Sequence, residues 1–409
     1  MLSVIKNIIV KNKIVLKLVL SIINRCRRVV YLVLFRPLPI RSKTILFCSH
    51  LGKNYSCNPK AIYEELLKDQ NYLEYSFVWA FKDVSSTSID RGITVKYGSL
   101  KYLYYLSIAK YWIFNAKMPY CYPKKLGQIY LQTWHGTPLK RLAADIYVGE
   151  DAKFYRSEMS KNEMTQSYLK DSQRYDYMIS ANKFSSEAFK SAFKIEDKVI
   201  IETGYPRNDI LTNSSEEHIF DLKEKYSIPK EKTIVLYAPT WRDNVYDTKG
   251  YIFELQVDFQ QWYEVLGDDY VIIYKPHYLI YNTSNKKIKE GFVYDASQCE
   301  DINDLYLMSD ILVTDYSSVF FDYGVLKRPV LFYMYDLETY RDNLRGFYLD
   351  IYTDLPGPIL EDEQDVLQSI LNIEEVTKEY RERMDNFYDE FCSMSDGNSS
   401  RKVIDIILK

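Results

Sequence analysis

The sequence of 409 residues contains little histidine and little cysteine, and both shortages limit the chemistry open to the chain. It has four histidines in all. Its six cysteines stand apart, without a Cys-x-x-Cys pair, at positions 26, 48, 57, 121, 299 and 392. Isolated cysteines argue against a zinc site and for a protein kept in the reducing cytosol. We therefore predict no metal site and no resident cofactor.

The common nucleotide-binding motifs are also absent. The sequence has no Gly-x-x-x-x-Gly-Lys-Ser/Thr, no Gly-x-Gly-x-x-Gly, and no Asp-x-Asp pair of the type that holds a metal against a nucleotide diphosphate. A P-loop NTPase and a standard dinucleotide enzyme are therefore not indicated. The net charge of −3 gives no support for nucleic-acid binding. Fixed cations and a helix N-terminus are then the simpler means of stabilising phosphate charge.

Acidic residues are missing from the beginning of the chain, where the first is Glu64. Cations are spaced there among Ile, Leu and Val, at Lys6, Lys11, Lys13, Lys17, Arg25, Arg27, Arg28, Arg36, Arg41 and Lys43. The longest uninterrupted apolar run, residues 29–35, is far shorter than the roughly 20 residues that span a bilayer. We predict that residues 1–43 form an amphipathic segment lying on an anionic membrane surface. A surface helix docked on the neighbouring domain is the alternative.

Short runs rich in Val, Ile, Leu and Tyr predict strands of parallel sheets buried on both faces. In the first half they are residues 44–49, 75–81, 111–115, 129–133, 177–180 and 199–203, with helical patterns between most of them at 59–68, 100–110 and 185–193. In the second half they are residues 233–237, 271–274, 292–294, 311–314 and 330–333. We predict an α/β protein of two doubly wound domains, 44–210 and 211–409, because this length suggests two domains.

Polar loops follow several predicted strands. His135 follows one strand and His277 follows another, so two of the four histidines stand just past strand ends. In open α/β sheets the loops at the carboxyl ends of strands line the ligand crevice, which favours a functional role for both. The alternative for each is a hydrogen-bonded structural histidine.

The loop after residues 311–314 contains Asp315, Ser317 and Ser318 and leads into a predicted helix at 319–326. Hydroxyls and free backbone N–H groups at the start of a helix suit a phosphate group. The alternative is an ordinary N-cap. Cationic or imidazole side chains in the neighbouring loops are expected to help neutralise a diphosphate, namely Arg242, Lys275, His277 and Arg345.

Several ordered motifs resemble those of the CDP-glycerol glycerophosphotransferase family of teichoic acid synthesis. They are QTWHGTPLK (132–140), YAPTWR (237–242), DLY (304–306) and DILVTDYSSVFFD (310–322), with YSCNPK (55–60), GYPR (204–207), RGFY (345–348) and DG (396–397) as further matches. The resemblance spans about residues 44–405.

The resemblance implies a GT-B arrangement, in which two Rossmann-like domains face each other across a cleft. It also implies transfer of a polyol phosphate from a CDP-activated donor to a hydroxyl of an undecaprenyl-linked glycan or polyol phosphate polymer, with release of CMP. The family works peripherally at the cytoplasmic face of the plasma membrane. This location agrees with the basic N-terminal segment, which the residues predict independently.

The resemblance also implies roles for single residues. His135 matches the histidine proposed as general base, and an unperturbed imidazole pKa near 6.5 suits that task. His277, with Lys275, is expected to bind the donor pyrophosphate. Phosphoryl transfer depends mainly on positioning and electrostatics, so a polar cradle supplies most of what it needs. On the donor side we also expect Thr314, Asp315, Ser317, Ser318, Arg242 and Arg345, with Asp322 accepting from ribose hydroxyls.

Four residues are predicted to face the acceptor: Gly52, Asn58, Lys140 and Arg141. Simpler explanations compete, since Asn58 would also cap its helix before Pro59 and the two cations would also solvate a surface.

The sequence leaves the substrates open. The donor is CDP-glycerol or CDP-ribitol, and the acceptor is a teichoic acid or a capsule polymer. The enzyme either primes a chain or extends it. A nucleotide-sugar glycosyltransferase of the same fold is a further alternative, and a non-catalytic polymer- or lipid-binding protein is disfavoured by the intact His135 and His277. The oligomeric state is not predicted.

Overall fold

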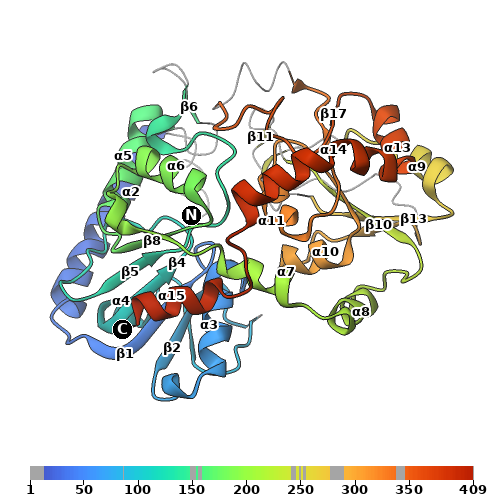
Figure 1. The fold of residues 1–409 in the computed structure, drawn as a ribbon. Helices are drawn as coiled ribbons and strands as arrows, with labels where there is room; N and C mark the ends of the chain where they lie inside the picture. The colour runs from blue at the N-terminus through green and yellow to red at the C-terminus, as the bar shows by residue number, and fades with distance from the viewer. Residues whose placement is uncertain are drawn as a thin grey trace, which may run out of the picture.

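The computed structural model describes residues 13–85, 87–147, 153–154, 159–240, 246–247, 250–251, 255–276, 290–337 and 346–408. Two α/β units lie side by side in this structure, and each is built around one parallel sheet (Figure 1). The predicted fold class is confirmed.

The first sheet has seven strands in the order β3-β2-β1-β4-β5-β8-β9. All of its pairings are parallel. The strands are β1 (Arg41–Cys48), β2 (Ser76–Phe81), β3 (Ile93–Lys96), β4 (Ala109–Phe114), β5 (Ile129–Gln132), β8 (Tyr177–Ser180) and β9 (Ile200–Glu202). The order reverses between β1 and β4, which is the switch point where Rossmann-like sheets open a crevice.

The second sheet has six strands in the order β14-β13-β10-β15-β16-β17, again all parallel. The strands are β10 (Thr233–Ala238), β13 (Tyr270–Tyr274), β14 (Val293–Asp295), β15 (Ile311–Thr314), β16 (Val330–Tyr333) and β17 (Ile359–Leu360). Its switch point lies between β10 and β15, so the two sheets repeat one topology.

The predicted strands are confirmed to within a few residues, whereas β3 and β17 were not predicted. Both are edge strands of the sheets. Strand β3 buries only one of its four residues, and β17 is only two residues long. Short edge strands lack the continuous apolar run that marks a strand covered on both faces.

Four predicted helices have different bounds in the structure. Helix α4 (Leu100–Ile108) ends where β4 begins, and α6 (Lys183–Phe193) begins two residues early. Helix α11 (Val319–Tyr323) is only one turn long before it tightens into a 3-10 turn, Gly324–Leu326. The predicted cap at Asn58 is wrong, because α3 (Cys57–Lys68) begins earlier and its N-cap is Ser56.

The last helix, α15 (Ser399–Ile407), returns to the first sheet. Its buried Val403, Ile404 and Ile407 share an apolar cluster with β1, β2 and α3. Figure 1 shows this red helix beside the blue α3, away from α14 (Ile373–Phe387). The chain end therefore completes the first core, although the predicted boundaries placed all of residues 211–409 in the second domain.

The basic N-terminal segment is helical from residue 13. Helix α2 (Lys13–Val30) continues into a π-helical turn, Tyr31–Phe35. Tyr31 is fully buried, and its ring meets the edge of Tyr122 at 5.5 Å. Apolar side chains before and after this anchor are exposed, namely Leu18, Ile22, Ile23, Val29, Val33 and Leu34. Within the described part of the chain, no helix combines the length and apolar character that crossing a bilayer requires.

Candidate active site

His135 stands in the loop that follows β5. The residue before it, Trp134, is buried with a positive φ of 51° and packs against Phe189 and Phe193 of α6. The Trp134 ring stacks on the His135 imidazole with centroids 4.4 Å apart. Packing of the tryptophan thus fixes the loop, while the His135 side chain itself remains exposed.

The hydrogen bond of His135 determines its tautomer. Its Nδ1 lies 2.7 Å from the backbone carbonyl oxygen of Asn115. Because a carbonyl only accepts, we assign the proton to Nδ1, which leaves a lone pair on Nε2. Although His135 as a residue is exposed, its imidazole is desolvated by the groups around it, and this desolvation, reinforced by His50 and Arg207, lowers the pKa of His135 to about 3. The pKa is thus not the unperturbed one predicted, and the imidazole is neutral at pH 7.

His50 is a neighbour of this site that the sequence analysis missed. It lies two residues past the end of β1, and its ring centroid is 5.8 Å from that of His135. The buried Asn115 side chain holds it twice, since Oδ1 accepts from the His50 backbone N–H at 2.7 Å and Nδ2 lies 3.2 Å from Nε2. Burial lowers the pKa of His50 to about 4. His50 directly follows the predicted strand 44–49, and this position in the sequence could have indicated its place at the site.

The loop of Ser317 and Ser318 meets the His135 loop across the two domains. Both serines are half-buried at the start of α11. A side chain added at Gly136 would lie 3.4 Å from the Ser318 Oγ. The two loops therefore lie within van der Waals reach of each other. The structure thus brings the His135 loop and the Ser317–Ser318 loop together.

Thr314 and Asp315 are occupied within the second domain. The Thr314 hydroxyl donates to the carbonyl of Ala238 at 2.8 Å, and Asp315 accepts from the backbone and hydroxyl of Thr240 at 2.8 and 2.7 Å. These bonds tie the carboxyl ends of β10 and β15 together. In this structure the two side chains shape the loop, and their donor contacts stay predictions.

Asp322 lies on α11 and is buried. Its two oxygens accept from the Arg207 guanidinium and, at 2.8 Å, from the Asn208 amide. Arg207 ends the GYPR motif, for which the sequence predicts no role. The structure places its guanidinium 2.7 Å from the His135 carbonyl oxygen. Both carboxylate oxygens of Asp322 thus have protein partners in this structure. The contact of Asp322 with a ribose hydroxyl stays a prediction.

Lys275 directs its ammonium at backbone carbonyls. It donates to Ala296, Ser297 and Cys299 at 2.9, 3.2 and 2.7 Å, which fixes the loop after β14. Burial lowers the pKa of Lys275. His277, Arg242 and Arg345 lie outside the described residues, so their predicted roles stay predictions. Among the residues described, no three His, Cys, Asp or Glu side chains are grouped to hold a metal ion.

The predicted acceptor residues of the first domain shape its loops. The buried Asn58 amide donates to the carbonyls of Thr133 and Trp134 at 2.9 and 3.2 Å. Gly52 has a φ of 79°, and an added Cβ would lie 3.0 Å from backbone atoms of Ala80 and Lys82. Asn58 thus clamps the His135 loop from behind, and Gly52 permits a tight turn after β1.

Lys140 and Arg141 reach the second domain through their backbones. Lys140 forms an isolated antiparallel bridge with Phe347, and the Arg141 N–H donates to the Gly346 carbonyl at 3.0 Å. The Arg141 guanidinium lies 5.4 Å from the centroid of the Tyr348 ring. The two residues therefore continue the His135 loop into a contact with the second domain rather than into a free surface.

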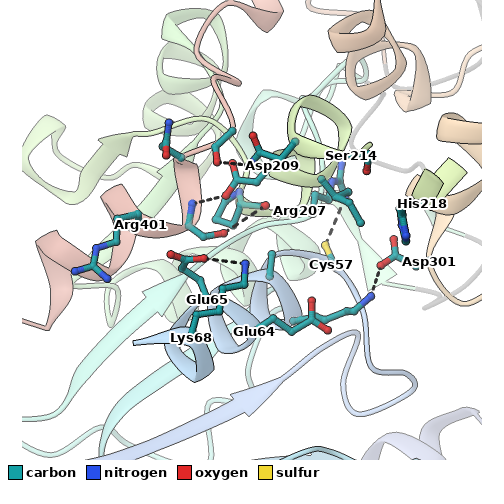
Figure 2. A pocket seen from close by; sticks show the side chains of 18 of the residues that line it. Cys57, Glu64, Glu65, Lys68, Arg207, Asp209, Ser214, His218, Asp301 and Arg401 are labelled. Carbon is teal, nitrogen blue, oxygen red and sulfur yellow. Dashed lines mark hydrogen bonds and ion pairs between the residues drawn. The ribbon is translucent and has the colours of Figure 1, made fainter. Parts of the chain in front are cut away.

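A cavity of about 520 Å³ lies behind this junction, between α3, α7 (Asp209–Asn213), α8 (Glu216–Lys225) and α15 (Figure 2). Its lining includes Cys57 and Arg207, and Lys60 there forms an ion pair with Asp301 of the second domain at 2.8 Å. His135 does not line it. The cavity thus adjoins the His135 loop through Arg207, which lines the cavity and donates to the His135 carbonyl.

Two Rossmann-like sheets with a histidine loop of one against a serine loop of the other define a GT-B-like protein. Residues 30–409 match the family described as CDP-Glycerol:Poly(glycerophosphate) glycerophosphotransferase. The chain belongs to this family.

Curated relatives of the chain are teichoic acid enzymes. It is 42% identical to the teichoic acid poly(glycerol phosphate) polymerase of Staphylococcus epidermidis, over 90% of this chain and 51% of that protein. It is 42% identical to the protein of the same name from Bacillus spizizenii, covering 93% and 96%. It is 41% identical to the teichoic acid glycerol-phosphate transferase of Staphylococcus aureus, covering 89% and 92%. The chain thus spans about half the length of some relatives and nearly all of others.

Solved structures of the wall teichoic acid polymerase TagF have the same fold. One superposes with a TM-score of 0.87 at 39% identity, covering 96% of this chain and 94% of that one. Another, of a TagF variant soaked with CDPG, gives 0.87 at 39% identity and covers 99% and 95%.

Proposed function

We propose that the protein transfers glycerol phosphate from CDP-glycerol to a hydroxyl of a lipid-linked teichoic acid acceptor and releases CMP. The observation that carries the proposal is the neutral His135 imidazole, whose Nδ1–H is held by the Asn115 carbonyl, beside the Ser317–Ser318 loop. Family membership supports the same reaction.

In this reaction His135 Nε2 takes the proton of the acceptor hydroxyl as its oxygen attacks the glycerol-bearing phosphorus. The bond from that phosphorus to the bridging oxygen breaks, and CMP leaves with the oxygen. The approach of the anionic donor raises the low pKa of His135, because a nearby negative charge favours the imidazolium. Ser317, Ser318 and the first N–H groups of α11 hold the transferring phosphate.

Sequence identity favours glycerol over ribitol. The glycerol-phosphate enzymes are 40–42% identical to this chain. The ribitol-phosphate enzymes are 27–30% identical. We therefore propose CDP-glycerol as the donor.

Calorimetric titration tests the donor. We expect CDP-glycerol to bind at least about tenfold more tightly than CDP-ribitol, as expected where a site distinguishes hydroxyl patterns. Ser317→Ala with Ser318→Ala should weaken CDP-glycerol binding by about tenfold, since two hydrogen bonds are lost. Ser393→Ala, an exposed serine near the chain end, is the control. Binding of a UDP-sugar alone would instead make the protein a glycosyltransferase.

The lipid-linked acceptor requires the enzyme to work at a membrane, and we propose peripheral binding to the cytoplasmic face through α2. Exposed Leu18, Ile22 and Ile23 stand on this helix with Arg25, Arg27 and Arg28, and no acidic residue precedes Glu64. Apolar residues that insert beside cations that attract anionic lipid are typical of interfacial helices.

Replacing Leu18, Ile22 and Ile23 by serine should reduce sedimentation with anionic phospholipid vesicles by at least about tenfold, because three inserting side chains are lost. Truncation through residue 40 is less informative, since it removes the fully buried Tyr31. Leu126→Ser, at a fully exposed leucine elsewhere, is the matched control. Vesicle binding equal to that of the unaltered protein would contradict the proposal.

A further inference from the structure

Arg207 joins the His135 loop to the donor-side domain. It lies in the short 3-10 turn between the sheets, Pro206–Asn208. One guanidinium nitrogen, Nη1, donates to the His135 carbonyl at 2.7 Å and lies 3.4 Å from the Cys57 Sγ. The other, Nη2, donates to Asp322 on α11. A single planar group therefore connects the His135 loop, α3 and α11, the helix that follows Ser318.

The backbone of Arg207 is fixed from both domains as well. Its N–H donates to the Asn58 Oδ1 at 3.1 Å, and its carbonyl accepts from the Asn303 amide. Asn58 also holds the carbonyls of Thr133 and Trp134. The main chain of Arg207 and the His135 loop thus share one clamp, which leaves little freedom for either to move alone.

The pair of Arg207 and Asp322 is more buried than the pair of Lys60 and Asp301, which also joins the domains. The side chains are 12% and 5% exposed, against 23% and 21% for Lys60 and Asp301. Burying two charges costs desolvation energy that their attraction only partly offsets, so such a pair contributes little stability. The planar guanidinium of Arg207 instead donates to two acceptors at once, so it fixes the position of one acceptor relative to the other.

We propose that Arg207 is a positioning residue that sets the distance between His135 and the Ser317–Ser318 loop. The proposal rests on the function proposed above, because its effect on rate requires His135 to be the base. Lysine at position 207 keeps the charge but, as a single point donor, does not bind the His135 carbonyl and Asp322 together.

The test compares the unaltered protein with Arg207→Lys. We expect kcat for glycerol phosphate transfer to fall between about 10-fold and 100-fold, because a misplaced base lowers the rate by about this factor. The KM for CDP-glycerol should change by less than about threefold. Amide hydrogen exchange of residues 133–141 should accelerate by at least about tenfold, because the loop has lost one tie. Hydrogen exchange is measured without substrate, so it tests whether Arg207 holds the His135 loop even if the proposed reaction is wrong.

Two variants separate positioning from general stability. Lys60→Met removes the Lys60–Asp301 ion pair between the domains and should leave kcat and loop exchange unchanged. Arg328→Lys disturbs an arginine that donates to the carbonyls of Tyr306, Leu307 and Ser309 within the second domain, and should lower only the melting temperature. Unchanged kcat or unchanged loop exchange in Arg207→Lys overturns the proposal. An equal loss of kcat in Lys60→Met also overturns it.

Discussion

His135→Ala should lower the rate of glycerol phosphate transfer by at least about 1,000-fold, at the upper part of the range for loss of a positioned general base. In the proposed reaction the Nε2 lone pair accepts the hydroxyl proton, and alanine supplies none. Donor binding should change by less than about threefold, because in the same proposal the Ser317–Ser318 loop holds the phosphate. Radioactive transfer into polymer and calorimetric titration with CDP-glycerol measure the two quantities.

The control for this substitution is His218→Ala, because His218 lies on α8 outside the catalytic loop. Its transfer rate should stay within about twofold of the unaltered protein. The melting temperature of both variants shows that each is folded. A folded His135→Ala protein that loses CDP-glycerol binding would make His135 a donor ligand instead of the base.

The sequence predicts the two sheets well because their central strands are buried on both faces. A continuous apolar run that helical patterns flank, such as the run in β10 or β13, indicates a strand of a parallel sheet. The position of His135 follows from the same logic, because a residue just past such a strand stands at the edge where crevices open. Asn58 shows the limit, since Asn before Pro predicts a cap, yet its amide binds the carbonyls of the His135 loop.

Contacts between distant segments are what the sequence does not show. The apolar face of α15 predicts that the helix is buried, but it does not say in which of two cores. Arg207 belongs to a recognisable motif, yet its partners Asp322 and Cys57 are 115 and 150 residues away in the chain. His50 lies in the site because β1 pairs with β4, which places His50 beside Asn115.

Acid should destabilise the protein partly through His50. Its pKa in the folded state is about 4, below the ordinary value of 6.5, because burial disfavours the imidazolium. Between these two pH values the unfolded chain binds the proton and the folded chain does not. The stabilisation is therefore complete above pH 6.5, is lost as the pH falls, and stops changing below pH 4. The slope approaches about 1.4 kcal/mol per pH unit, so the total loss over the interval from pH 6.5 to pH 4 is about 3 kcal/mol.

His50→Asn isolates this contribution, because asparagine tolerates the positive φ of 46° at this position better than most residues. Urea unfolding at pH 7 and at pH 4.5 should show a smaller acid-induced loss in His50→Asn than in the unaltered protein, by about 2 kcal/mol. Protonation of carboxylates affects both proteins and cancels in the comparison. His218→Asn controls for removing one of the four histidines. Equal losses in all three proteins would mean that His50 is already protonated at pH 4.5 in the folded state, and the pair it forms with His135 would then carry a charge.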